Sequence, residues 1–97
     1  MSVKVLKFSA TWCGPCKIMG PIFEKVSKLD KFKNIDFKSY DIEDDEEGVE
    51  LVEKFSVRNI PTIIIVDEND NQMKKIIGAV QENELINLIE ETVQHEL

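Results

Sequence analysis

The sequence predicts an α/β fold, with a four-stranded mixed sheet and helices on both of its faces. A short, wholly apolar run at 62–66 is typical of a central strand that is buried on both sides. Apolar residues recur at helical spacing in three other segments, which predicts three helices. Strands and helices follow in the order βαβαββα, whose first half requires a parallel strand pair joined by a right-handed crossover.

The first half of the chain supplies this βαβ unit. Residues 2–10 are rich in Val, Leu and Phe and predict a strand. From Cys16 to about Leu29, apolar residues recur at helical spacing, and Pro21 inside this helix should kink it because proline removes a backbone hydrogen bond. A second strand is predicted at 35–41, with one face more polar than the other, because two sets of side chains alternate there. One set is Ile35, Phe37 and Ser39, and the other is Asp36, Lys38 and Tyr40.

The second half predicts a short helix, a hairpin and a final helix. Acidic residues suit the start of a helix at 46–55. The strand at 62–66 is followed by turn-forming residues at 67–71 and a partner strand at 73–77. Asn83 can cap the final helix, which has an apolar stripe that we expect to be core. The stripe consists of Leu85, Ile86, Leu88, Ile89 and Val93.

Size and charge narrow the class of protein. The 97 residues suffice for one domain, so we expect a single domain over 1–97 that acts as a monomer. The net charge of -7 gives an acidic surface, which repels phosphates and anionic headgroups, so we expect neither a nucleic-acid partner nor a membrane partner. Residues 1–8 are too short to hold a signal peptide before the first motif, so we expect a cytoplasmic location.

The chemistry is carried by the motif Trp12-Cys13-Gly14-Pro15-Cys16, between a predicted strand and a predicted helix. The first turn of a helix presents unpaired N–H groups and the positive end of the dipole, which stabilise a thiolate. The pKa of Cys13 should therefore fall from about 8.5 towards about 7 or below. We expect Cys13 to be the exposed nucleophile and Cys16, one turn on and more buried, to resolve the mixed disulfide.

A buried structural pair and half of a zinc site are the other interpretations of two cysteines at this spacing; Gly-Pro between the cysteines at a helix start argues against both. Structural zinc normally needs four Cys or His ligands, and the chain holds two cysteines and one histidine, His95. We expect His95 to be solvated rather than a ligand. We therefore expect no metal and no bound cofactor, with the cysteine pair itself as the redox centre.

Several segments resemble the thioredoxin family. The stretch 8–17 (FSATWCGPCK) is similar to the family's active-site segment, and Pro21 falls where thioredoxins carry a kinking proline. The stretch 55–62 resembles the segment that holds a cis-proline, here Pro61, and 77–79 matches a glycine-containing loop. The resemblance implies a thioredoxin-like fold.

The resemblance also implies a substrate groove beside the cysteines. A substrate's extended backbone would pair with the main chain of Ile60, as in strand addition. The implied activity is reduction of protein disulfides by dithiol–disulfide exchange, with electrons from a flavoprotein thioredoxin reductase. The groove residues would be Trp12, Gly14, Pro15, Ile60, Pro61, Gly78 and Ala79.

The chain departs from the family ahead of the motif. Thioredoxins have a strand and a helix before the strand that leads to the cysteines, and the 12 residues ahead of Cys13 cannot hold them. We therefore expect a fold cut down to its core, with the strand at 35–41 at an edge. Asp36 and Lys38 would guard that edge against pairing with another chain, although plain solvated strand residues are an equally good interpretation.

Lys7 is a second departure. It lies six residues before Cys13, where thioredoxins carry a buried Asp that is thought to shuttle the proton of the second cysteine. A cation there would stabilise thiolates and favour the reduced form, making the protein a weaker reductant. A desolvated Lys7 could also have a lowered pKa and act as a base. The alternative is that its ammonium reaches Asp41 or the sheet edge and takes no part in the chemistry.

Two other functions compete with disulfide reduction. One is a glutaredoxin-like reductase that is reduced by glutathione, which the small size supports and the Trp-Cys-Gly-Pro-Cys motif does not. The other is a non-catalytic adaptor that uses the fold as a clamp on a partner, for which the cysteines would be dispensable.

Overall fold

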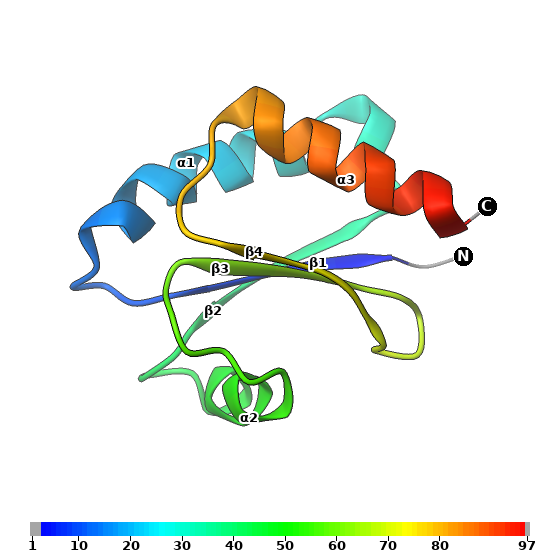
Figure 1. The fold of residues 1–97 in the computed structure, drawn as a ribbon. Helices are drawn as coiled ribbons and strands as arrows, with labels where there is room; N and C mark the ends of the chain where they lie inside the picture. Colours follow the sequence, from blue (N-terminus) through cyan, green and yellow to red (C-terminus); the bar gives the residue numbers. More distant parts are fainter. Residues whose placement is uncertain (1–2, 97) are drawn as a thin grey trace.

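The computed structural model describes residues 3–96, with side chains described as far as residue 94. One four-stranded sheet carries helices α1 and α3 on one face and helix α2 on the other (Figure 1). The predicted α/β class, with a mixed sheet covered on both faces, is therefore confirmed. None of the described helices combines the length and the apolar character that crossing a membrane demands.

The predicted order of strands and helices is confirmed, with one short helix added. The added element is η1, a single turn of 3-10 helix between α1 and β2. The elements are β1 (Lys4–Ser9), α1 (Gly14–Ser27), η1 (Asp30–Phe32), β2 (Asp36–Asp41), α2 (Glu46–Lys54), β3 (Thr62–Val66), β4 (Gln72–Ile77) and α3 (Glu82–Glu96).

The strands lie in the order β2-β1-β3-β4. β1 runs parallel to β2 and antiparallel to β3, and β3 forms an antiparallel hairpin with β4. β2 is thus an edge strand, as predicted, and Asp36 and Lys38 on it are both exposed. Every residue of β3 is buried, as the apolar run predicted.

The sheet separates two hydrophobic cores. Side chains alternate along β1, so that Val5 packs beneath α1 and α3 while Leu6 and Phe8 pack towards α2. The stripe on α3 is core, as predicted, because Leu85 and Ile89 are fully buried against α1 and the sheet.

Helix α1 begins earlier than the sequence predicted. Its first residue is Gly14 rather than Cys16, because the sulfur of Cys13 caps the helix and Pro15 fits its first turn. The helix ends at Ser27, before the predicted Leu29, whose extended backbone instead starts η1. Pro21 lies inside α1, as predicted.

The predicted cap at Asn83 is wrong. α3 starts at Glu82, and the N–H of Leu85 donates to the carbonyl of Gln81 at 2.9 Å, so Gln81 occupies the cap position. The acids ahead of α2 do serve its N-terminus, since the carboxylate of Asp45 accepts from two backbone N–H groups of the first turn.

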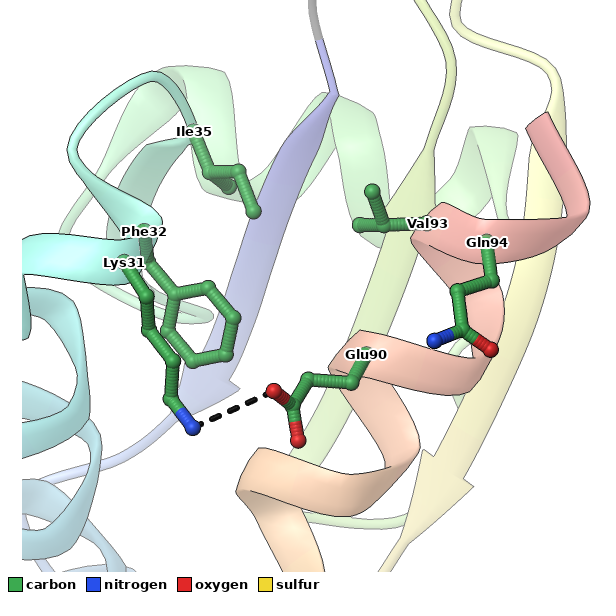
Figure 2. A pocket seen from close by; sticks show the side chains of 6 residues that line it. All are labelled: Lys31, Phe32, Ile35, Glu90, Val93 and Gln94. Atoms are coloured by element: carbon green, nitrogen blue, oxygen red, sulfur yellow. Dashed lines mark hydrogen bonds and ion pairs between the residues drawn. The ribbon is translucent and has the colours of Figure 1, made fainter. Parts of the chain in front are cut away.

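A hollow of about 210 Å³ lies between η1 and the last turns of α3. Phe32, Ile35 and Val93 line it, and an ion pair of 3.1 Å between Lys31 and Glu90 crosses its mouth (Figure 2). The elements that line it, η1 and the last turns of α3, lie at the opposite end of the sheet from the turn that joins β1 to α1 (Figure 1).

Candidate active site

Cys13 and Cys16 form a disulfide at the N-terminus of α1. Their Cα atoms lie 5.2 Å apart. Cys13 has an extended backbone and is the N-cap of the helix, and its sulfur accepts a hydrogen bond from the N–H of Cys16 at 3.3 Å. The motif therefore places a sulfur where the unpaired N–H groups and the helix dipole favour negative charge.

The two cysteines are equally buried, which corrects the expectation that Cys13 is exposed and Cys16 more buried. Each is 5% exposed. The pair packs with Ala10 and against the partly buried Ile42 and Ile60, in a small cluster separate from the two main cores. In the disulfide state the motif's exposed surface therefore comes from Trp12, Gly14 and Pro15.

The loop before β3 reaches the cysteines from the other side. The peptide bond from Ile60 to Pro61 is cis, as the resemblance implied. The sulfur of Cys13 lies 3.8 Å from the carbonyl oxygen of Ile60. The N–H of Gly78 donates to the carbonyl of Pro61 at 2.9 Å, and Gly78 has a φ of +90°, which suits glycine. These contacts bring the three separate segments of the predicted groove together.

The groove residues differ in how much surface they present. Pro61 is fully buried, so its ring supports the loop and does not line the surface. Trp12 is 64% exposed. Ile60 and Gly78 are half-buried, and the remaining members, Gly14, Pro15 and Ala79, are exposed.

Glu43 is a neighbour of the site that the sequence did not single out. Its carboxylate accepts a hydrogen bond from the indole N–H of Trp12. The carboxylate of Asp41 accepts from the N–H groups of Asp44 and Glu43, which lowers the pKa of Asp41 and fixes the turn that presents Glu43. The sequence did hold a signal for this contact. Trp12 follows β1 and Glu43 follows β2, and the carboxyl ends of two adjacent parallel strands lie at the same edge of the sheet.

Lys7 is buried beneath α1. Its side chain is 8% exposed, and its ammonium nitrogen lies 5.4 Å from the ring centroid of Phe23. Burial lowers the pKa of Lys7, and the charge of Glu24 opposes that shift. The interpretation that Lys7 reaches Asp41 is wrong, because the ammonium lies against α1.

The Lys7 ammonium lies against the same face of α1 that carries Cys16. The ammonium nitrogen lies 3.8 Å from where a Cβ on Gly20 would stand. Gly20 follows Cys16 by four residues, so the two share a face of α1. The Lys7 ammonium therefore lies about one helical turn, roughly 6 Å along the axis, from the position of Cys16 on the helix.

Metal ligands do not gather around the cysteines. Within residues 3–94, no group of three or more His, Cys, Asp or Glu side chains is placed to hold a metal ion. The side chain of His95 lies outside the described residues. The chemistry that this arrangement offers is the making and breaking of the bond between Cys13 and Cys16.

Comparison with known proteins places this geometry in a family. The family model described as Thioredoxin matches residues 2–91. A thioredoxin of Mycoplasmoides gallisepticum is 40% identical over 85 residues, covering 88% of this chain and 79% of its own. A thioredoxin of Borreliella burgdorferi is 39% identical over 88 residues, covering 90% of this chain and 70% of its own.

Solved structures agree with the sequence relatives. The crystal structure of Malassezia sympodialis thioredoxin has a TM-score of 0.80 at 30% identity, over 93% of this chain and 74% of that one. A structure described as a malarial protein has a TM-score of 0.78 at 32% identity, over 95% of this chain and 98% of that one. From the family match over nearly the whole chain and the disulfide at the start of α1, it follows that this protein belongs to the thioredoxin family.

Proposed function

We propose that this protein reduces disulfide bonds in other proteins by dithiol–disulfide exchange through Cys13 and Cys16. The observation that carries the proposal is the hydrogen bond from the N–H of Cys16 to the sulfur of Cys13 at the N-terminus of α1. In the reduced protein the same N–H and the helix dipole stabilise the Cys13 thiolate, which is the form that attacks disulfides.

The exchange proceeds in two steps. The Cys13 thiolate attacks one sulfur of the substrate disulfide, so a mixed disulfide forms and the other substrate sulfur leaves as a thiolate. Cys16, deprotonated, then attacks the sulfur of Cys13, which releases the second substrate thiolate and closes the Cys13–Cys16 bond. The substrate gains two electrons, and its two thiolates take up two protons, one released by Cys16 and one from water, to which Cys13 had already lost its own proton. We infer that a flavoprotein thioredoxin reductase returns two electrons to the pair.

We assign substrate binding to the groove formed by the motif, the Ile60–Pro61 loop and Gly78-Ala79. The 3.8 Å approach of the Cys13 sulfur to the Ile60 carbonyl supports this assignment, since a substrate strand on the main chain of Ile60 would pass the reactive sulfur. The exposed indole of Trp12 offers apolar surface on the other side of that sulfur.

We assign Lys7 the role of a thiolate modulator that acts through space. Its ammonium lies against α1 about one turn, roughly 6 Å, from Cys16 along the axis, and its partial desolvation leaves its charge less screened by water than that of a surface lysine. It therefore stabilises the dithiolate and favours the reduced form, which makes the protein a weaker reductant. A stabilisation of about 1.4 kcal/mol corresponds to about 30 mV for this two-electron couple.

Reduction of insulin disulfides tests the function. With dithiothreitol as electron donor, we expect the protein to speed reduction and Cys13→Ser to abolish the effect. Cys16→Ser should still attack but should accumulate the mixed disulfide, visible by mass spectrometry. Full activity in Cys13→Ser would contradict the proposal and favour the adaptor. Reduction of the oxidised protein by glutathione, but not by a flavoprotein reductase with NADPH, would favour the glutaredoxin-like alternative.

A further inference from the structure

A second hollow adjoins the groove on the side of α1 and α3. It has a volume of about 380 Å³ and lies where the connection from β4 to α3 passes α1. Its apolar residues come from α1 and from the connection, and two polar residues complete the lining. The lining consists of Ile18, Ile22, Ala79, Val80, Gln81 and Glu84.

Ile18 gives this hollow an exposed apolar wall. It is 63% exposed, although it lies on α1 only two residues after Cys16. Ile22 and Val80 beside it are half-buried and pack against the core beneath α1. A single exposed isoleucine is ordinary on a protein surface, but here it is joined by three further apolar residues around a concavity. Such an arrangement is suited to covering by an apolar group.

The hollow is continuous with the proposed groove through Ala79, which belongs to both. The segment carrying Ala79 is tied to the loop before β3 by the hydrogen bond between Gly78 and Pro61. Ile18 follows Cys13 by five residues, which is about 7.5 Å along the helix axis. An extended peptide covers that distance in two or three residues, at about 3.3 Å per residue.

We propose that this hollow binds a large apolar side chain of the substrate polypeptide, two or three residues from the cysteine that Cys13 attacks. The proposal rests on the proposed function, because it extends the groove by one side-chain pocket. Ile18, Ile22 and Val80 provide the apolar surface. The exposed carboxylate of Glu84 is part of the lining and disfavours an acidic side chain at that position.

Synthetic peptides with one cysteine test the proposal. The cysteine carries thionitrobenzoate as a mixed disulfide, and pre-reduced protein releases the coloured thiolate at a measurable second-order rate. Peptides with Leu, Ser or Glu at the second and third residues on either side of the cysteine are compared. We expect the best Leu peptide to react about tenfold faster than its Ser counterpart. The Glu peptide should be the slowest.

Ile18→Ala should remove most of the preference for Leu and leave the Ser peptide unchanged. It should also leave unchanged the rate with the symmetric disulfide of thionitrobenzoate, which has no peptide to enter the hollow. The matched control is Val49→Ala, because Val49 is also an exposed apolar residue on a helix, but on α2 and away from the hollow. Val49→Ala should change none of these rates.

The outcomes separate this proposal from the proposed function. If the wild-type protein releases thionitrobenzoate from no disulfide, the proposed function is wrong. If it reacts with every peptide and shows no preference for Leu, or if Ile18→Ala slows all disulfides equally, only the hollow's role is wrong. A wild-type dimer in sedimentation that Ile18→Ala converts to a monomer, without any Leu preference, would assign the hollow to self-association and overturn the proposal.

Discussion

The ammonium nitrogen of Lys7 lies 3.8 Å from the point where a Cβ on Gly20 would stand. A largely buried lysine thus holds its ammonium against the helix that begins at the active-site cysteines, at a position that has no side chain. Desolvating part of a charge without an ion-pair partner costs free energy. The position of Lys7 therefore has consequences for stability and for redox behaviour that can be measured separately.

Replacing Lys7 by Met should stabilise the protein. Burial lowers the pKa of Lys7 in the folded state, so the unfolded chain binds this proton more tightly. The cost is fully present below the folded pKa and is relieved as pH rises towards the ordinary value. We expect Lys7→Met to be more stable by about 1 kcal/mol at pH 7, with a difference that narrows as pH rises towards the ordinary lysine pKa of about 10.4. Urea unfolding over this pH range measures this, and a difference that is constant with pH would contradict it.

Replacing Lys7 by Asp should make the protein a stronger reductant. Removing the cation and adding a carboxylate destabilises the thiolates, so we expect the midpoint potential to fall by about 30 mV or more. The pH dependence of Cys16 reactivity should shift towards alkaline values. Lys38→Asp, on the exposed edge strand β2, is the control for the change in net charge. An unchanged potential together with an unchanged pH profile would show that Lys7 takes no part in the chemistry.

Replacing two helical glycines by alanine should change the stability of the protein in opposite directions. At Gly48 a Cβ would lie 2.7 Å from the carbonyl oxygen of Asp41, so Gly48→Ala must push α2 away from β2 and should cost about 1–3 kcal/mol. At Gly20 the nearest atom is the Lys7 ammonium at an ordinary contact distance, so Gly20→Ala should gain up to about 1 kcal/mol from helix propensity. Thermal unfolding of both variants checks this, and a stabilised Gly48→Ala would contradict the packing of α2.

Asp70 links three elements through two ion pairs. Its carboxylate lies 3.1 Å from the Lys4 ammonium and 3.5 Å from the Lys54 ammonium, which joins the hairpin turn to β1 and α2. Since these groups are partly exposed, Asp70→Asn should cost only about 0.2–1 kcal/mol. Asparagine also tolerates the positive φ of 64° at this position.

The pH dependence of Asp70→Asn has a definite sign. The hydrogen bond from Lys4 and the charges of Lys4 and Lys54 lower the pKa of Asp70. Its contribution is therefore present above the ordinary carboxyl pKa and is lost as pH falls through the lowered value. Wild type and Asp70→Asn should converge in stability under acid conditions and in high salt. A difference that persists at low pH would assign the loss to the turn and not to the ion pairs.

Much of the fold could be predicted because the hydrophobic pattern is strong. The run at 62–66 has the bounds of β3, because the four successive β-branched apolar residues after Thr62 favour a strand that is buried on both faces of a sheet. The helix predicted at 46–55 matches α2 within one residue, because its start is marked by acids and its apolar spacing is regular. The resemblance located the segments of the site in advance, including the cis bond before Pro61.

The rest depended on atoms that a pattern does not reveal. The start of α1 was missed because its cap is a sulfur, whereas sequence rules look for Ser, Thr, Asp or Asn. The same rules proposed Asn83 for α3, although the helix starts one residue earlier. Equal burial of the cysteines depends on Ile42 and Ile60, which are distant in sequence. The bond from Trp12 to Glu43 likewise joins segments that only the folded chain brings together.

The atom that is oxidised and reduced also holds the first turn of α1 in place. Adding electrons to Cys13 turns a neutral acceptor of the Cys16 N–H into an anionic one, which tightens that hydrogen bond. The stability of the first turn of α1 is thereby coupled to the redox state of the two cysteines. The exchange rate of the Cys16 amide proton should therefore report the redox state. Its exchange with deuterated water should be slower in the reduced protein than in the oxidised protein.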